Sequence, residues 1–154
     1  MAVRVQTQDF DIAAEIAALT SDRTDIGAVV TFTGLVRGQA SGHDLVSMTL
    51  EHYPGMTEAE LEAVEAEAHA RWPLQASLIV HRVGELQPGA NIVLVITASP
   101  HRQAAFQAAE FLMDYLKTRA PFWKKETFAG GQSAWVDARE ADATAVERWT
   151  RSPS

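Results

Sequence analysis

The chain has 154 residues, of which 47% are hydrophobic and 21% charged, a composition typical of a globular domain. Its formal net charge of -7 argues against general nucleic-acid binding, and the lack of cysteine excludes disulfides, thiolate nucleophiles and cysteine-based metal sites. No apolar run approaches the roughly 18 residues that span a bilayer, and residues 1–6 lack a secretory h-region. We therefore expect a cytoplasmic protein without membrane segments, forming a single domain over 1–154 with a tail at 151–154.

Hydrophobic periodicity and turn residues predict a mixture of helices and strands. Helices are predicted at 9–19, from 57 to about 72, from 99 to about 120, and at 140–150. Strands are predicted at 27–37, 45–53, 75–82 and 91–98, with two short strands within 125–136 and a small, polar loop at 38–44. The order of elements predicts an α+β fold with a mixed or antiparallel sheet and helices packed on one side.

Single residues mark where these elements begin and bend. Asp9 is a candidate cap for the first helix, and Thr57 with Glu60 has the spacing of a capping box for the second. Ser99 is a candidate cap for the third helix, with proline at its first position. Gly34 is typical of a bulge or of a close approach between backbones.

Cations gather around the proline that ends the third predicted helix. A stretch of nine residues around Pro121 holds four cations in an otherwise acidic chain: Lys117, Arg119, Lys124 and Lys125. The negative end of the helix dipole attracts cations, which can explain the presence of Lys117 and Arg119 but not of Lys124 and Lys125. The remaining pair favours a pocket for an anionic substrate, although solvated charge runs are the commoner case. A lysine in such a pocket, partly buried among other cations, can move protons or attack a carbonyl as a neutral amine.

Three more cationic or polar residues lie at ends of predicted elements, where binding sites are commonly built. Arg37 ends the first long strand, while His101 and Arg102 lie in the first turn of the third helix. A cation at the positive end of a helix dipole works against stability, so Arg102 favours an anionic partner such as a phosphate or carboxylate. The other histidines show no metal-ligand spacing and are interpreted as structural or surface residues: His43, His52, His69 and His81.

Several uncommon strings within residues 27–139 resemble the large, catalytic subunit of molybdopterin synthase. They are TFTG at 31–34 followed by Arg37, LEHYPGM at 50–56, VHRVGEL at 80–86, SPHR at 99–102 and MDYLKTRAPFWKKE at 113–126. The resemblance implies an α+β fold with a hammerhead-like arrangement and a small added β subdomain. It implies no cofactor and no metal.

The activity implied by this resemblance is sulfur transfer. Such proteins convert cyclic pyranopterin monophosphate into molybdopterin by installing two sulfurs as a dithiolene. Each sulfur arrives on the C-terminal Gly-Gly thiocarboxylate of a small ubiquitin-like partner, whose tail enters a pocket of the large subunit. Two large subunits form a central homodimer, and one small subunit at each end completes a heterotetramer. A chain without a thiol would need such an external sulfur carrier.

The resemblance also assigns roles to particular positions. It implies that Lys117 and Lys124 are catalytic, the first acting in sulfur transfer directly or as an acid or base, the second orienting substrate and stabilising negative charge. Arg37, His101 and Arg102 would hold the phosphate, with possible help across the dimer. The full set of implied substrate-binding positions is Leu35, Val36, Arg37, His101, Arg102, Lys125 and Glu126. The loop after Arg37 lacks the asparagine expected in relatives.

Two other functions are compatible with the same residues. One is a lysine-dependent enzyme that acts on another phosphorylated small molecule without a protein sulfur donor. The other is a non-catalytic module that binds anions or a partner.

Overall fold

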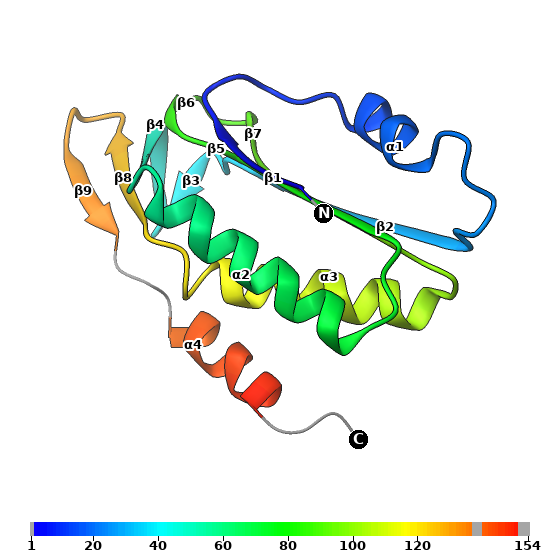
Figure 1. Ribbon diagram of the computed structural model, residues 1–154. Coiled ribbons are helices and arrows are strands. Elements are labelled where there is room, and N and C mark those ends of the chain that lie inside the picture. Colours follow the sequence, from blue (N-terminus) through cyan, green and yellow to red (C-terminus); the bar gives the residue numbers. More distant parts are fainter. Residues whose placement is uncertain (1, 137–139, 151–154) are drawn as a thin grey trace.

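Two sheets form the framework of the protein in the computed structural model, which describes residues 2–136 and 140–150 (Figure 1). The first sheet has the order β1-β5-β7-β2 and consists of β1 (Ala2–Gln6), β5 (Ala76–Arg82), β7 (Asn91–Ser99) and β2 (Ala28–Leu35). Strands β1 and β5 run parallel and the other pairs antiparallel, so the predicted mixed sheet is confirmed.

The second sheet is antiparallel and corresponds to the added β subdomain. It has the order β3-β4-β8-β9, with β6 paired to β4, and consists of β3 (Gln39–Ala40), β4 (His43–His52), β8 (Phe122–Phe128), β9 (Ser133–Val136) and β6 (Gly84–Leu86). The segment predicted as a loop at 38–44 thus contains a short strand. Because β6 follows β5 closely in the chain, the backbone passes from the first sheet to the second between Arg82 and Gly84.

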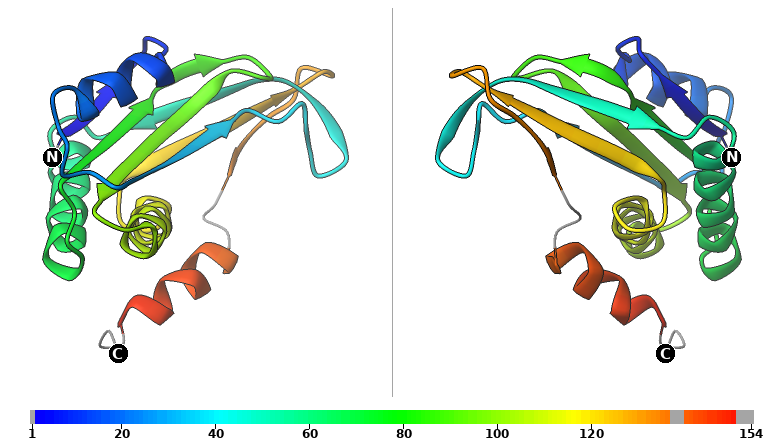
Figure 2. Two further views of the ribbon diagram at one scale, coloured as in Figure 1. Left: turned by 90° about the vertical axis from the view of Figure 1, so that its right-hand side faces the viewer. Right: turned by 90° about the vertical axis from the view of Figure 1, so that its left-hand side faces the viewer.

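The helices lie on both faces of the first sheet (Figure 2). They are α1 (Ile12–Thr20), α2 (Met56–Arg71), α3 (Arg102–Leu116) and α4 (Glu140–Glu147), the last continued by a 3-10 turn over Arg148–Thr150. The two longest helices, α2 and α3, pack on one side as expected, whereas α1 covers the opposite face.

The central strand β7 explains this layering. Its side chains alternate, so that Val93 and Val95 pack against α2 and α3 while Leu94 and Ile96 pack under α1. The prediction that this strand is buried on both faces is confirmed. Among the described residues, no helix has the length and apolar character needed to cross a membrane. The predicted tail at 151–154 lies outside the described residues.

The first helix begins at a different residue from the predicted one. Asp11, not Asp9, caps α1 by accepting a hydrogen bond from the Ala14 N–H at 3.1 Å. Asp9 instead accepts from the Asn91 side-chain amide at 2.9 Å, because it lies beside the start of β7.

The predicted capping box of α2 is also wrong. Helix α2 begins after Gly55, whose N–H donates to the Glu58 carboxylate at 3.3 Å. Thr57 is fully buried, and its hydroxyl donates to the Pro121 carbonyl at 2.9 Å. This contact ties the start of α2 to the segment that follows α3.

The third helix begins after His101 rather than at Ser99, which is the last residue of β7. The predicted irregularity at Gly34 is confirmed, because the β2–β7 register shifts between Gly34 and Leu35. A Cβ at Gly34 would lie 2.8 Å from the Val93 Cγ1, so glycine permits this close approach.

Candidate functional site

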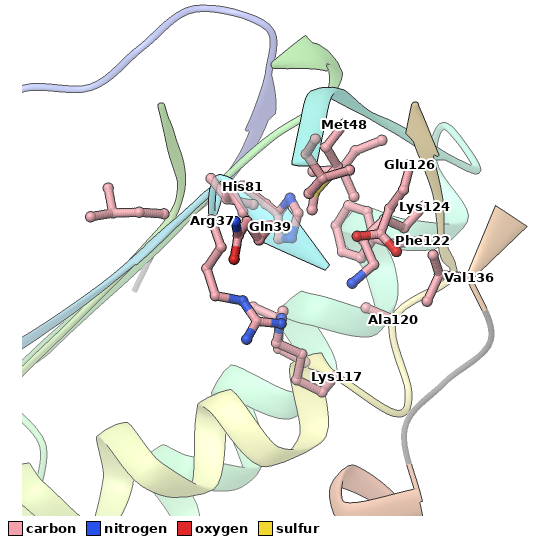
Figure 3. Close-up of a pocket in the computed structure, with 15 residues that line it drawn as sticks. Arg37, Gln39, Met48, His81, Lys117, Ala120, Phe122, Lys124, Glu126 and Val136 are labelled. Carbon is pink, nitrogen blue, oxygen red and sulfur yellow. The ribbon is translucent and has the colours of Figure 1, made fainter. Parts of the chain in front are cut away.

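A cavity of about 320 Å³ lies where the two sheets and the C-terminal end of α3 meet. Its polar lining consists of Arg37, Gln39, His81, Lys117, Lys124 and Glu126 (Figure 3). The remaining walls are apolar and include Leu35, Met48, Leu50, Ile92, Phe122 and Val136. Cations on an apolar background suit a ligand that carries both an anionic group and a flat or extended apolar part.

The break at Pro121 brings Lys117 and Lys124 to the same cavity. Helix α3 ends at Leu116, and the Lys117 N–H still donates to the Met113 carbonyl at 3.2 Å. The chain then turns and returns as β8, which carries Lys124. Both proposed catalytic lysines therefore face one space, as Figure 3 shows.

Strand parity decides which residues of β8 reach the cavity. Phe122, Lys124 and Glu126 alternate along β8 and line it. Lys125 points to the opposite face, where its ammonium lies 5.7 Å from the centre of the Trp135 ring. Of the cationic pair in this strand, the structure thus brings Lys124 to the cavity and directs Lys125 away from it.

The same alternation separates the residues at the end of β2. Leu35 and Arg37 line the cavity, while the Val36 side chain is buried against Met48 and Leu86. Both backbone polar groups of Val36 are bonded within the protein, to residues 89 and 90. Val36 therefore anchors this wall, and its neighbours present their side chains to the cavity.

His101 and Arg102 lie at the other end of α3 from Lys117. The helix has 15 residues, so these two positions are about 22 Å from the cavity end of the helix. Both side chains are exposed. Within one chain the structure does not bring them to the cavity.

Arg119, the remaining cation near Pro121, is used within the fold. Its guanidinium donates to the Glu67 carboxylate at 2.8 Å and to the Glu60 carboxylate at 3.3 Å, both on α2. These ion pairs turn Arg119 away from the cavity and join the segment after α3 to α2.

His81 is a cavity residue that the sequence reasoning assigned to structure or surface. It is 3% exposed and stacks on Phe122 with ring centres 3.8 Å apart. Burial lowers the pKa of His81 to about 4, with further lowering by the positive charge of Lys117. The sequence feature that could have pointed to His81 is the VHRVGEL string at 80–86, which contains it.

Among the described residues, no cluster of three or more acidic or histidine side chains could hold a metal ion.

The sequence matches the family model described as MoaE protein over residues 5–119, about three quarters of the chain. The chain belongs to the MoaE protein family. The family assignment agrees with the resemblance found in the sequence strings.

Individual MoaE relatives match almost the whole chain. The molybdopterin synthase catalytic subunit of Rhizobium meliloti is 61% identical over 150 residues, covering 97% of this chain and 96% of the relative. The subunit of the same name from Mesorhizobium japonicum is 59% identical over 151 residues, covering 97% and 94%. These matches extend well past Lys124, which lies beyond the residues matched by the family model.

Solved structures of MoaE proteins share the fold. Molybdopterin cofactor biosynthesis protein E from Burkholderia multivorans has a TM-score of 0.82 at 51% identity, covering 99% of this chain and 98% of that chain. Molybdopterin synthase from Staphylococcus aureus has a TM-score of 0.79 at 32% identity, covering 87% and 96%. The predicted α+β class is confirmed by these neighbours.

Proposed function

We propose that this chain is the catalytic subunit of a molybdopterin synthase and converts cyclic pyranopterin monophosphate into molybdopterin. The observation that carries the proposal is the convergence of Lys117, Lys124 and Arg37 on one cavity, in a chain about 60% identical to proteins named as that subunit. The cytoplasm is the expected location of this reaction.

The cavity has the chemistry that this substrate needs. Arg37 and the two lysines offer charge-assisted hydrogen bonds to a phosphate, while Phe122 and the aliphatic side chains accept a planar ring system. Lys124 orients the substrate and stabilises the negative charge that develops as sulfur is added. Lys117, at the end of α3, acts in the sulfur-transfer step.

The sulfur comes from a small ubiquitin-like partner with a C-terminal Gly-Gly thiocarboxylate. This chain has no cysteine, so it has no thiol of its own on which to carry sulfur. The partner's tail enters the cavity, and each transfer leaves that tail as an ordinary carboxylate once water has replaced the sulfur. Two sulfurs per product require two such deliveries.

His101 and Arg102 serve the cavity of a second copy of the chain in a homodimer. Their exposure and their distance of about 22 Å along α3 from Lys117 support a contribution across an interface rather than within one chain. A small subunit at each end of this dimer completes a heterotetramer.

Incubation of the purified chain with precursor and thiocarboxylated small subunit tests the activity. We expect dithiolene product from the wild type, none from Lys117→Ala, and strongly reduced turnover from Lys124→Ala. Lys125→Ala is the matched control, because it removes the same charge from the opposite face of β8, and it should keep most of the turnover. Normal turnover by Lys117→Ala would contradict its assigned role.

The same assay separates the two other functions. Turnover of the precursor without the small subunit would favour a lysine-dependent enzyme on a phosphorylated small molecule. Binding of the precursor without any turnover, unchanged in Lys117→Ala, would favour a non-catalytic anion-binding module.

Mixing two inactive variants tests the shared site. If Arg102 acts across the dimer, a mixed dimer of Lys117→Ala and Arg102→Ala chains contains one site with both residues intact, and activity reappears after mixing and re-equilibration. If each chain holds its own complete site, every site in the mixed dimer lacks one residue, and the mixture stays inactive.

A further inference from the structure

His81 lies at the junction between the two sheets. Its backbone belongs to β5, where it pairs with Val5 and Val93 of the first sheet. Its ring stacks on Phe122, which belongs to β8 of the second sheet. Figure 3 shows His81 across the cavity from Lys117, so a bound ligand would lie between these two side chains.

The hydrogen bond of the ring fixes what His81 can offer. Its Nδ1 lies 2.8 Å from the backbone carbonyl of Arg82, and a carbonyl oxygen only accepts, so Nδ1 carries the proton. In a neutral imidazole the other nitrogen, Nε2, is then an acceptor. The stack on Phe122 holds the ring in this orientation.

Burial, with a smaller effect of nearby positive charge, keeps the His81 ring neutral at pH 7. Burial and the positive charge of Lys117 disfavour the imidazolium form, and the pKa of His81 is lowered to about 4. Arg37 and Lys124 line the same cavity as donors, with Glu126 as a carboxylate beside them on β8. An uncharged acceptor on this wall therefore complements cations on the others.

We propose that His81 is a specificity-determining residue, whose Nε2 accepts a hydrogen bond from a ring N–H of a planar heterocyclic substrate while the cations hold that substrate's anionic group. The inference rests on the proposed function, in which the heterocycle is the pterin of the precursor. It assigns ring recognition to His81 and anion recognition to Arg37 and Lys124.

Two substitutions separate the roles of the two ring nitrogens. In His81→Asn the side-chain amide replaces Nδ1 and can still donate to the Arg82 carbonyl, but nothing replaces Nε2. In His81→Gln the longer side chain places an amide near the position of Nε2 and restores an acceptor there. His43→Asn, in the exposed β3–β4 hairpin, is the control for a histidine substitution outside the cavity.

The measurement is the equilibrium Kd of each full-length variant for cyclic pyranopterin monophosphate and, separately, for inorganic phosphate. We expect His81→Asn to weaken pterin binding about tenfold, the effect of one lost hydrogen bond, with unchanged phosphate binding. His81→Gln should stay within about threefold of the wild type for both ligands. In turnover, His81→Asn should raise KM more than it lowers kcat.

Two results would overturn the inference: wild-type pterin affinity in His81→Asn, or equal weakening of pterin and phosphate binding in that variant. If His81→Asn keeps wild-type affinity and His81→Gln loses it, His81 matters only through its bond to Arg82. Absence of dithiolene product from the wild type would count against the proposed function instead, and the difference between the two ligands would still be measurable.

Discussion

Acidification should destabilise this protein through His81. Burial lowers the pKa of the folded imidazole from its ordinary value of 6.5 to about 4. The unfolded chain therefore binds a proton at a pH at which the folded chain does not. The contribution of His81 to the free energy of unfolding is therefore fully present above pH 6.5 and is lost as the pH falls toward 4.

The size of the effect follows from the shift of the pKa. Each unit corresponds to about 1.4 kcal/mol, so the His81 contribution to the free energy of unfolding falls by about 2 kcal/mol at pH 5 and about 3 kcal/mol at pH 4, relative to pH 7. Because the side chain is 3% exposed, solvent screening reduces this value little.

Urea unfolding of the wild type and of His81→Gln at pH 7, 6, 5 and 4 measures this contribution. Glutamine does not titrate, so the difference between the two free energies of unfolding isolates His81 from every other group. We expect the wild type to lose stability relative to the variant as the pH falls. Two parallel curves would refute the reasoning, because they would mean that the imidazole is protonated equally in both states.

Three further predictions concern positions away from the cavity lining. Thr57→Val should lower the free energy of unfolding by about 2 kcal/mol, because the hydroxyl that donates to Pro121 and accepts from another backbone group is lost, whereas Thr57→Ser should retain most of it. Burial raises the pKa of the Glu65 carboxyl above 4.5, so the stability that Glu65 contributes is present at acid pH and is lost as the pH rises through the raised pKa. In urea titrations, Glu65→Gln should therefore gain stability over the wild type as the pH rises above 4.5. A difference between the two free energies of unfolding that stays constant with pH would contradict this. Gly27→Ala should destabilise by about 1–3 kcal/mol in thermal or urea unfolding, because the new Cβ would overlap the Pro100 carbonyl oxygen; a variant as stable as the wild type would show that this backbone can move apart.

Features set by local sequence were predictable. The apolar run at 91–98 specified a strand buried on both faces, and the strand is central in the structure. The break in the helix before Pro121 was also predictable, although α3 ends at Leu116 rather than near 120, and the turn that follows brings Lys117 and Lys124 to one cavity. The bulge at Gly34 followed from the one residue type that permits a close approach to Val93.

Caps were predicted less well because distant partners decide them. Asp9 and Asp11 are chemically equivalent as candidates, and the choice depends on Asn91, which takes the side chain of Asp9. Thr57 has the residue type of a cap but bonds to Pro121, 64 positions away. No local pattern contains either contact.

The cavity lining depended on strand parity. The first of the two late strands is predicted to begin at Lys125, whereas β8 begins at Phe122. With the correct start, alternation along the strand places Lys124 and Glu126 on one face and Lys125 on the other. His81 was missed because its significance comes from Phe122, which lies in the other sheet.

The convergence of three cations on a small cavity has a thermodynamic consequence. Arg37, Lys117 and Lys124 offer positive charge at the seam of the two sheets, with the Glu126 carboxylate in the same lining. An anion that binds these cations joins the end of α3 to β2 and β8. Ligand at 100 times its Kd would add about 2.7 kcal/mol to the free energy of unfolding. Occupancy of the cavity should therefore be visible as a higher melting temperature, without any enzymatic turnover.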